Sequence, residues 1–286
     1  MAIVLDNITY TYGMGTPFEK TALHGISLTI ENGEFLGVIG HTGSGKSTFV
    51  QHLNGLLHPT TGTVTVNGVD ISASTEEAKK MRHKVGMVFQ YPEHQLFEET
   101  IAEDIAFGPK NLGLSSDEVD ERVRDAMKFV GLDYNTYAER SPFHLSGGQM
   151  RRVAIAGVVA MNPDFLVLDE PSAGLDPFGR EEIFEEIIRL HKEKGITVIL
   201  VSHNMEDISR MASRLVVLDK GRIVLDGEPM DIFNNHRDEL QAVGVDVPPV
   251  SVTMEYLREQ GLDVSNRVLS VDDAVQAILE GGSHVK

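Results

Sequence analysis

The sequence predicts an α/β fold with a parallel sheet and crossover helices, and three observations lead to this prediction. Short apolar runs typical of buried strands alternate with segments of helical spacing along most of the chain. One run is followed by a glycine-rich loop and a helical segment, and another ends in two adjacent carboxylates. Ligands bind at such strand ends in open α/β sheets. The 286 residues are enough to bury a large core in one or two domains.

The first part of the chain predicts an N-terminal antiparallel β-subdomain and then a buried strand. Residues 2 to about 33 contain three β-like runs, Ile3–Leu5, Ile8–Tyr10 and Ile26–Ile30, which are broken by a glycine-rich turn. Phe35–Ile39 is a short apolar run of the type found in buried parallel strands. We therefore expect the main sheet to begin here.

The middle of the chain predicts a helix, a strand and a long helical stretch. Helical spacing runs from Lys46 to Leu56, and Thr63–Val66 alternates like a strand before a turn at Asn67-Gly68. From Ile101 to about Met161 the signals are mainly helical. We predict that residues of about 91–162 form an inserted helical subdomain. Breaks in it are expected at Pro109, Gly113 and Pro142.

Two further buried strands and a hairpin complete the predicted main domain. Phe165–Leu168 and Ile196–Val201 are the strands, and a helix around Arg180–Glu193 separates them. Leu215–Asp219 and Arg222–Asp226 flank a two-residue turn and predict the hairpin.

The end of the chain predicts a small separate unit. The pattern loosens after Pro229, so we place the main domain at residues 1–230 and a C-terminal extension at residues 231–286. Val252–Glu259 and Ser270–Leu279 have the spacing of two short helices, the second opened by a capping box.

Composition limits the function classes. No apolar stretch approaches the roughly 18 residues of a membrane span, and the chain start lacks the features of a signal peptide, so we expect a cytosolic location. The absence of cysteine excludes disulfides and thiolate metal sites. A formal net charge of −18 argues against general nucleic-acid binding, because most of the surface would repel phosphates.

The glycine-rich loop fits the P-loop pattern and lies where that pattern must lie, between a buried strand and a helix. Its glycines allow backbone N–H groups to surround phosphates, and the helix start adds a positive dipole end. Lys46 is expected to neutralise the β and γ oxygens, Ser47 to ligate Mg²⁺, and Thr48 to reach the α-phosphate. The expected nucleotide-binding loop is Gly40, His41, Thr42, Gly43, Ser44, Gly45, Lys46, Ser47 and Thr48.

Three polar residues end neighbouring predicted strands. Asp169 and Glu170 follow an apolar strand, so both should emerge at its carboxyl edge. There Asp169 is expected to hold Mg²⁺, and Glu170 to polarise an attacking water as general base. His203 closes a third strand on the same edge, where it can contact a γ-phosphate.

A second phosphate-binding helix start is predicted far from the first. Ser146 is its N-cap, and Gly147, Gly148 and Gln149 follow with exposed backbone N–H groups. One nucleotide needs only one P-loop. We therefore expect this helix start to cap the nucleotide of a facing subunit.

Taken together, these motifs resemble those of ABC-type ATPases over residues 1 to about 230. The resemblance implies a P-loop NTPase fold with an inserted helical subdomain, and implies ATP and Mg²⁺ as cofactors. It also implies that Gln90 senses Mg²⁺ and the attacking water, that His203 is a switch histidine, and that Ser172–Asp176 crosses to the other subunit. Tyr12 is the expected adenine-stacking residue, with Tyr10 as the open alternative.

The run after Gln90 resembles a narrower family. Tyr91–Thr100 and Glu103–Leu112 are similar to the EcfA/CbiO group of energy-coupling factor importer ATPases, and most similar to the second of their two unlike ATPases. The resemblance implies vitamin or transition-metal import, with a partner ATPase, an EcfT-type membrane scaffold and interchangeable substrate-binding membrane subunits. It implies a peripheral location on the cytoplasmic face of the membrane, while the cargo stays undetermined.

Two surfaces are candidates for these contacts. Negative charge beside Gln90 suits arginines on a scaffold, although a solvated acidic helix face remains the alternative. Its carboxylates are those of Glu93, Glu98, Glu99, Glu103 and Asp104. Apolar residues of the extension are expected either to join two ATPases or to pack on their own domain. They are Val252, Leu257, Val275, Ile278 and Leu279.

The sequence therefore predicts an ATP-hydrolysing importer subunit, and two alternatives stay open. One is an ATPase of another ABC transporter class. The other is a nucleic-acid-processing ABC ATPase, which the net charge and the compact segment between Lys46 and Leu145 disfavour.

Overall fold

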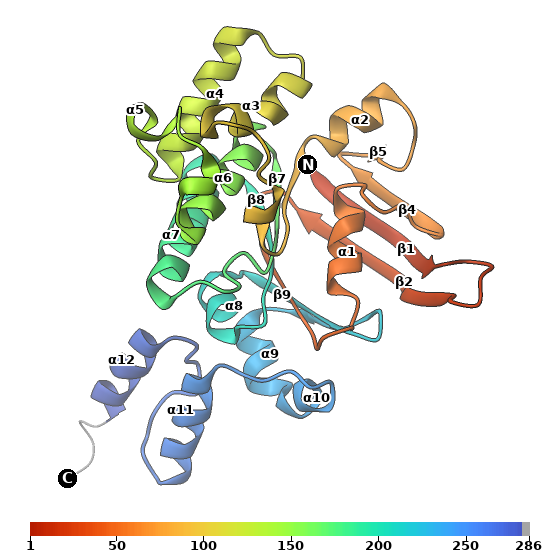
Figure 1. Cartoon of the computed structure of the whole chain (residues 1–286). Coiled ribbons are helices and arrows are strands. Elements are labelled where there is room, and N and C mark those ends of the chain that lie inside the picture. Colours follow the sequence, from red (N-terminus) through yellow and green to blue (C-terminus); the bar gives the residue numbers. More distant parts are fainter. Residues whose placement is uncertain (282–286) are drawn as a thin grey trace.

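A six-stranded sheet forms the centre of the computed structural model, which describes residues 1–281 (Figure 1). Five neighbouring strands are parallel, and one antiparallel strand closes the edge. In spatial order they are β10 (Arg222–Gly227), β9 (Arg214–Asp219), β3 (Phe35–Ile39), β8 (Thr197–Val201), β7 (Phe165–Asp169) and β6 (Val85–Val88). The predicted parallel α/β sheet is thus confirmed.

The central strands are buried on both faces, as their continuous apolar runs predicted. Every residue of β3, β7 and β8 is buried. Alternate side chains point to two different cores: Leu166 and Leu168 of β7 belong to the core of the helical side, and Val167 to the core beneath the N-terminal sheet. β6 was not predicted, because its four residues are too few to show a period.

A second, antiparallel sheet contains the N-terminal strands, in the order β2 (Lys20–Glu31), β1 (Ala2–Tyr12), β4 (Thr61–Val66) and β5 (Val69–Asp70). It packs with helix α1 (Lys46–Leu53) in one core. Two of the predicted runs are one strand, β1, whose register shifts between Leu5 and Ile8, where Asn7 has a positive φ of 48°.

The helical insert lies on the other side of the central sheet (Figure 1). Its elements are the short helix η1 (Pro92–Gln95), α3 (Ile101–Asn111), α4 (Ser116–Phe129), α5 (Tyr134–Tyr137), the short helix η2 (Pro142–His144) and α6 (Gly147–Ala160). The expected break at Pro109 was wrong, because α3 continues through it to Asn111. Proline is tolerated in this last turn, and the chain leaves the helix around Gly113, which has a φ of 76°.

The remaining helices cover the sheet and form the tail. They are α2 (Glu76–Arg82), α7 (Pro177–Lys194), α8 (Met205–Met211), α9 (Pro229–Asn235), α10 (Arg237–Ala242), α11 (Pro249–Glu259) and α12 (Val271–Gly281). α2, α9 and α10 are too short to have given a sequence signal. Phe233 and Leu240 still pack in the main core, and a small separate core gathers around Met254, Val264 and Val268. Within residues 1–281, no helix is long and apolar enough to cross a membrane.

Candidate functional site

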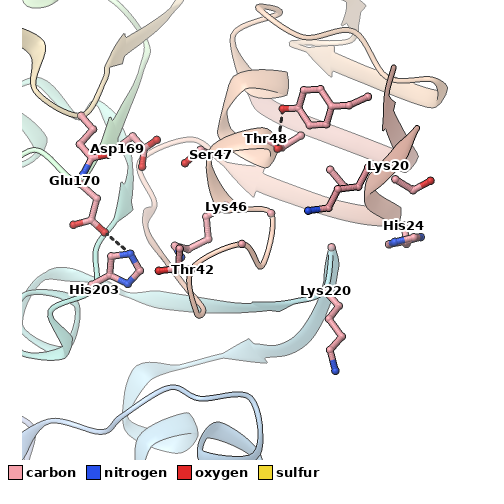
Figure 2. Close-up of a pocket in the computed structure, with 17 residues that line it drawn as sticks. Lys20, His24, Thr42, Lys46, Ser47, Thr48, Asp169, Glu170, His203 and Lys220 are labelled. Atoms are coloured by element: carbon pink, nitrogen blue, oxygen red, sulfur yellow. Dashed lines mark hydrogen bonds and ion pairs between the residues drawn. The ribbon is translucent and has the colours of Figure 1, made fainter. Parts of the chain in front are cut away.

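A cavity of about 580 Å³ opens at the carboxyl ends of the parallel strands, beside the N-terminal sheet (Figure 2). The parallel topology explains the position, since these strands end at one edge of the sheet. Four chain segments that leave this edge line the cavity: the P-loop after β3, Gln90 after β6, Asp169 and Glu170 at the end of β7, and His203 after β8.

The P-loop has a backbone that only glycine adopts easily at three positions, Gly40, Gly43 and Gly45. Gly40 has a φ of 152°, and an added Cβ would stand 2.3 Å from the carbonyl oxygen of Leu218. Gly45, with a φ of 108°, is the N-cap residue of α1. The first turn of α1 therefore faces the cavity with its backbone N–H groups, an arrangement suited to an anion.

Lys46 is the buried cation of the site, with 7% of its surface exposed. Its Nζ donates hydrogen bonds to the carbonyl oxygens of Gly40, at 2.6 Å, and His41, at 3.1 Å. Burial lowers the pKa of Lys46, and the carboxylates of Glu170 and Asp169 oppose that shift. The ammonium group is thus held at the cavity between the loop and the two acids (Figure 2).

Most of the predicted P-loop residues line the cavity, and three do not. Those that line it are Thr42, Gly43, Gly45, Lys46, Ser47 and Thr48. Gly40 shapes the turn below it. The His41 ring turns away, with Nε2 2.8 Å from a carboxylate oxygen of Asp219. Ser44 is fully buried, and its Oγ has no hydrogen-bond partner.

The two carboxylates at the end of β7 differ in environment. Burial raises the pKa of Asp169, while a hydrogen bond with Ser47 opposes that shift. Glu170 has a positive φ of 52°, which turns its side chain into the cavity (Figure 2). Burial, together with the neighbouring charge of Asp169, raises the pKa of Glu170 to about 7. Such a value suits a proton acceptor that works near neutral pH.

His203 lies next to Glu170, with 3.4 Å between its Nε2 and Oε1 of the glutamate. Partial burial and the charge of Lys46 lower the pKa of His203, so its neutral form is favoured at neutral pH. Figure 2 shows the Glu170 and His203 side chains directed toward each other, and both residues line the same cavity as Lys46. Acid, histidine and lysine thus come together from three different strand ends.

Tyr12 lines the cavity and Tyr10 does not. The Tyr12 hydroxyl is 3.1 Å from Oγ1 of Thr48, and the residue is 41% exposed. Tyr10 packs edge-on against Tyr12, with ring centroids 4.7 Å apart, and against His52 at 4.8 Å. Only the Tyr12 ring is therefore placed to meet a flat ligand group in the cavity.

The second predicted helix start lies in a separate hollow of about 820 Å³. Ser146 and Gln149 form a capping box: the Ser146 Oγ accepts from the backbone N–H of Gln149, and the Gln149 side chain accepts from that of Ser146. Gly147 and Gly148 line the hollow with them, and their Cβ positions are open. This hollow shares no lining residue with the cavity at Lys46.

Comparison with known proteins agrees with this geometry. The family described as ABC transporter matches residues 23–173. The energy-coupling factor transporter ATP-binding protein EcfA2 of Clostridium tetani is 53% identical over 280 residues, which are 98% of this chain and 97% of the relative. The protein of the same name from Clostridium acetobutylicum is 54% identical over 279 residues, with the same coverage. The chain belongs to the EcfA2 family of energy-coupling factor ATPases.

Solved structures agree on the fold of this EcfA2-family chain. The structure of cbiO1 from Clostridium perfringens, described as part of the ABC transporter complex cbiONQ, aligns with a TM-score of 0.73 and 36% identity. It covers 88% of this chain and 98% of its own. A dimeric structure of the ABC transporter cassette MJ0796 aligns with a TM-score of 0.70 and 32% identity, covering 79% and 98%. The predicted ABC ATPase fold and the resemblance to the EcfA/CbiO group are confirmed.

The cavity of this EcfA2-family chain also contains residues that sequence reasoning missed. Lys20, His24 and Lys220 line it, and the two lysines add positive charge (Figure 2). Lys20 is the strand partner of Tyr12 in the pairing of β1 with β2. Lys220 precedes Gly221, where a Cβ would stand 2.2 Å from the Ala22 carbonyl oxygen. The turn was predicted, but only the packing of two distant hairpins brings it to the P-loop.

Proposed function

We propose that this chain hydrolyses ATP in a site shared between two ATPase subunits and thereby powers an energy-coupling factor importer. One observation carries the proposal. The P-loop cavity contains Lys46, Glu170 and His203, whereas the helix start at Ser146 lines a different hollow of the same chain. Two subunits facing each other would let the second hollow complete the first. The dimeric cassette among the relatives supports this arrangement.

Binding in this proposal depends on charge and on stacking. The α1 helix start and Lys46 hold the phosphates, and Lys20 and Lys220 add attraction at the rim. The Tyr12 ring stacks on adenine, and its bond to Thr48 fixes the ring next to the loop. Holding the triphosphate in line with the attacking water supplies most of the catalysis, as expected for phosphoryl transfer.

Mg²⁺ fits the donor set at this edge. Ser47, Asp169 and Gln90 offer hydroxyl, carboxylate and amide oxygens to the same cavity, which are the hard ligands that Mg²⁺ prefers. Among residues 1–281 no cluster of three or more acidic or histidine side chains forms a metal cage, so phosphate oxygens would complete the coordination. When bound, the ion neutralises charge on the β and γ oxygens.

Glu170 is the proposed general base. It accepts a proton from the attacking water, and its pKa of about 7 makes it effective near neutral pH. His203 has its Nε2 3.4 Å from Oε1 of the glutamate, and in its neutral form it donates its one N–H to a γ-phosphate oxygen. Gln90, from the neighbouring strand end, positions the water.

The segment after Gln90 is the proposed docking surface for a membrane scaffold. Of the five carboxylates predicted to form this surface, some have partners within the chain and others are exposed. Glu93 pairs with Arg151, and Asp104 accepts hydrogen bonds from the backbone of Phe97 and Glu98. The outer surface instead combines exposed carboxylates with an exposed aromatic pair, whose rings lie 4.9 Å apart. These residues are Phe97, Glu99, Glu103 and Phe107. Such a surface suits a basic amphipathic helix.

The C-terminal extension is the proposed second contact between ATPase subunits. Leu257 and Ile278 pack on the tail's own core, whereas Val252, Val275 and Leu279 are about half exposed or more. We propose that a related ATPase of the same importer covers these side chains, and that the complex includes interchangeable substrate-binding membrane subunits. The chain would then lie peripherally on the cytoplasmic face of the membrane.

Purification from solubilised membranes followed by an ATPase assay tests this function. A tagged chain should capture a second ATPase and integral membrane proteins. In the captured complex, Glu170→Gln should cut turnover by about 10²–10⁴-fold while ATP still binds. Unchanged hydrolysis by that variant, or capture of no membrane protein, would refute the proposal.

A further inference from the structure

An arginine inside the helix that follows Ser146 makes an unusual set of contacts. Arg151 lies on α6 and is 1% exposed, the largest fully buried side chain of the described residues. A buried guanidinium is costly unless all its donors are satisfied. The acceptors around Arg151 come from two other segments of the chain, and both flank residues of the proposed active site.

The first acceptor is Glu93, three residues after Gln90. Arg151 Nε donates to Glu93 Oε2 at 3.1 Å, and Nη2 donates to Oε1 at 2.9 Å. This two-point geometry fixes orientation as well as distance. The Glu93 side chain is itself mostly buried, at 14% exposed, so solvent screens the pair weakly.

The second acceptors lie directly after Glu170. Arg151 Nη1 donates to the carbonyl oxygens of Pro171, at 3.1 Å, and Ala173, at 2.8 Å. A further contact joins the same two segments, since the Tyr91 ring packs against Gly174. A Cβ added at Gly174 would be 3.5 Å from Cε1 of Tyr91. The segments after Gln90 and after Glu170 thus meet on one guanidinium.

We propose that Arg151, with Glu93, is a positioning pair that holds Gln90 in register with Glu170. The inference rests on the proposed function and adds two residues that lie outside the cavity at Lys46 and line the hollow at Ser146. Since neither residue lines the cavity at Lys46 but both hold segments that do, loss of the pair should disturb the relative placement of the water-positioning amide and the base. ATP binding at the P-loop, on the other side of the site, should remain.

Two variants separate positioning from charge balance. Glu93→Gln keeps the shape and an acceptor but removes the charge. Arg151→Lys keeps the charge but cannot reach three groups with one ammonium. Both should lower kcat about 10–100-fold, because small misplacements of reacting groups cost rates of this order. The Kd for ATP should change less than about twofold, because the P-loop contacts that bind the nucleotide stay unchanged.

The control is Asp120→Asn, which removes the same chemical group from an arginine pair. Asp120 and Arg124 form an exposed pair within α4 that also contacts Tyr134 of α5, but it contacts neither the segment after Gln90 nor the segment after Glu170. Full-length variants, captured with their partner subunits, would be compared for kcat, ATP Kd and thermal midpoint.

Reduced kcat with retained ATP binding in Glu93→Gln and Arg151→Lys, and wild-type kcat in Asp120→Asn, is the expected result. Wild-type kcat in Glu93→Gln would overturn the inference. So would a parallel loss of ATP binding and kcat in both variants, which would indicate a purely structural role. A wild-type complex without hydrolysis would contradict the proposed function instead, which keeps the two failures distinct.

Discussion

Replacing the buried acid of the site by its neutral isostere should stabilise the nucleotide-free protein above neutral pH. In Glu170→Gln the side chain keeps its size but carries no charge to bury. The raised pKa of Glu170 means that the folded protein disfavours the ionised form. The wild-type protein therefore loses stability as pH rises from the ordinary carboxyl pKa of 4.5 to the folded value of about 7.

The size of the effect follows from that pKa. The difference between 4.5 and about 7 corresponds to about 3 kcal/mol in the free energy of unfolding. Because the carboxyl group keeps some contact with solvent, screening reduces the expected gain to about 1–2 kcal/mol. In a chain of this size that gain would raise the melting temperature by roughly 2–3 °C.

Thermal and urea unfolding between pH 5.5 and 8.5, without nucleotide or Mg²⁺, measures the difference. The gap between Glu170→Gln and wild type should widen with pH and level off above about pH 7.5. Glu259→Gln is the control, since it removes the same charge from an exposed site in the tail. The reasoning would be refuted if the stability difference between Glu170→Gln and wild type did not depend on pH. It would also be refuted if the wild type were more stable than the variant at pH 8.

Four further outcomes are expected. Tyr12→Ala should weaken ATP binding by about 10–100-fold in a titration, since stacking is worth about 1–3 kcal/mol, whereas Tyr10→Ala should mainly lower the melting temperature. The value of kcat/KM should rise with pH up to about 7 and then level off, as expected for Glu170 acting as a base; a flat profile would count against that role. Gly40→Ala should destabilise the fold by about 1–3 kcal/mol in urea unfolding, because its Cβ would strike the Leu218 carbonyl oxygen. Val275→Asp should weaken subunit association in sedimentation equilibrium if a partner covers the tail, and unchanged association would exclude that contact.

Much of the fold was predictable from sequence because buried parallel strands have a plain signature. Phe35–Ile39 and Phe165–Leu168 are unbroken apolar runs, each followed by residues with defined chemistry. Parallel strands end at one edge, so their order did not need to be known for Lys46, Glu170 and His203 to be expected together.

The features of the site that the sequence did not predict depend on tertiary contacts. Lys20 and Lys220 belong to no recognisable sequence motif. They reach the cavity only because two hairpins pack against the P-loop. Glu93 was predicted as part of an outward acidic surface, yet its carboxylate turns inward to Arg151. Sequence gives the charge of such a residue but not the direction of its side chain.

ATPase activity as a function of protein concentration tests the shared site most directly. Specific activity should fall steeply once the chain, together with its captured partner ATPase, is diluted below the concentration at which sedimentation shows dissociation. Residues of the Ser146 helix start would then no longer reach the nucleotide held at Lys46 of the facing subunit. Constant specific activity in a solution of monomers would contradict the account.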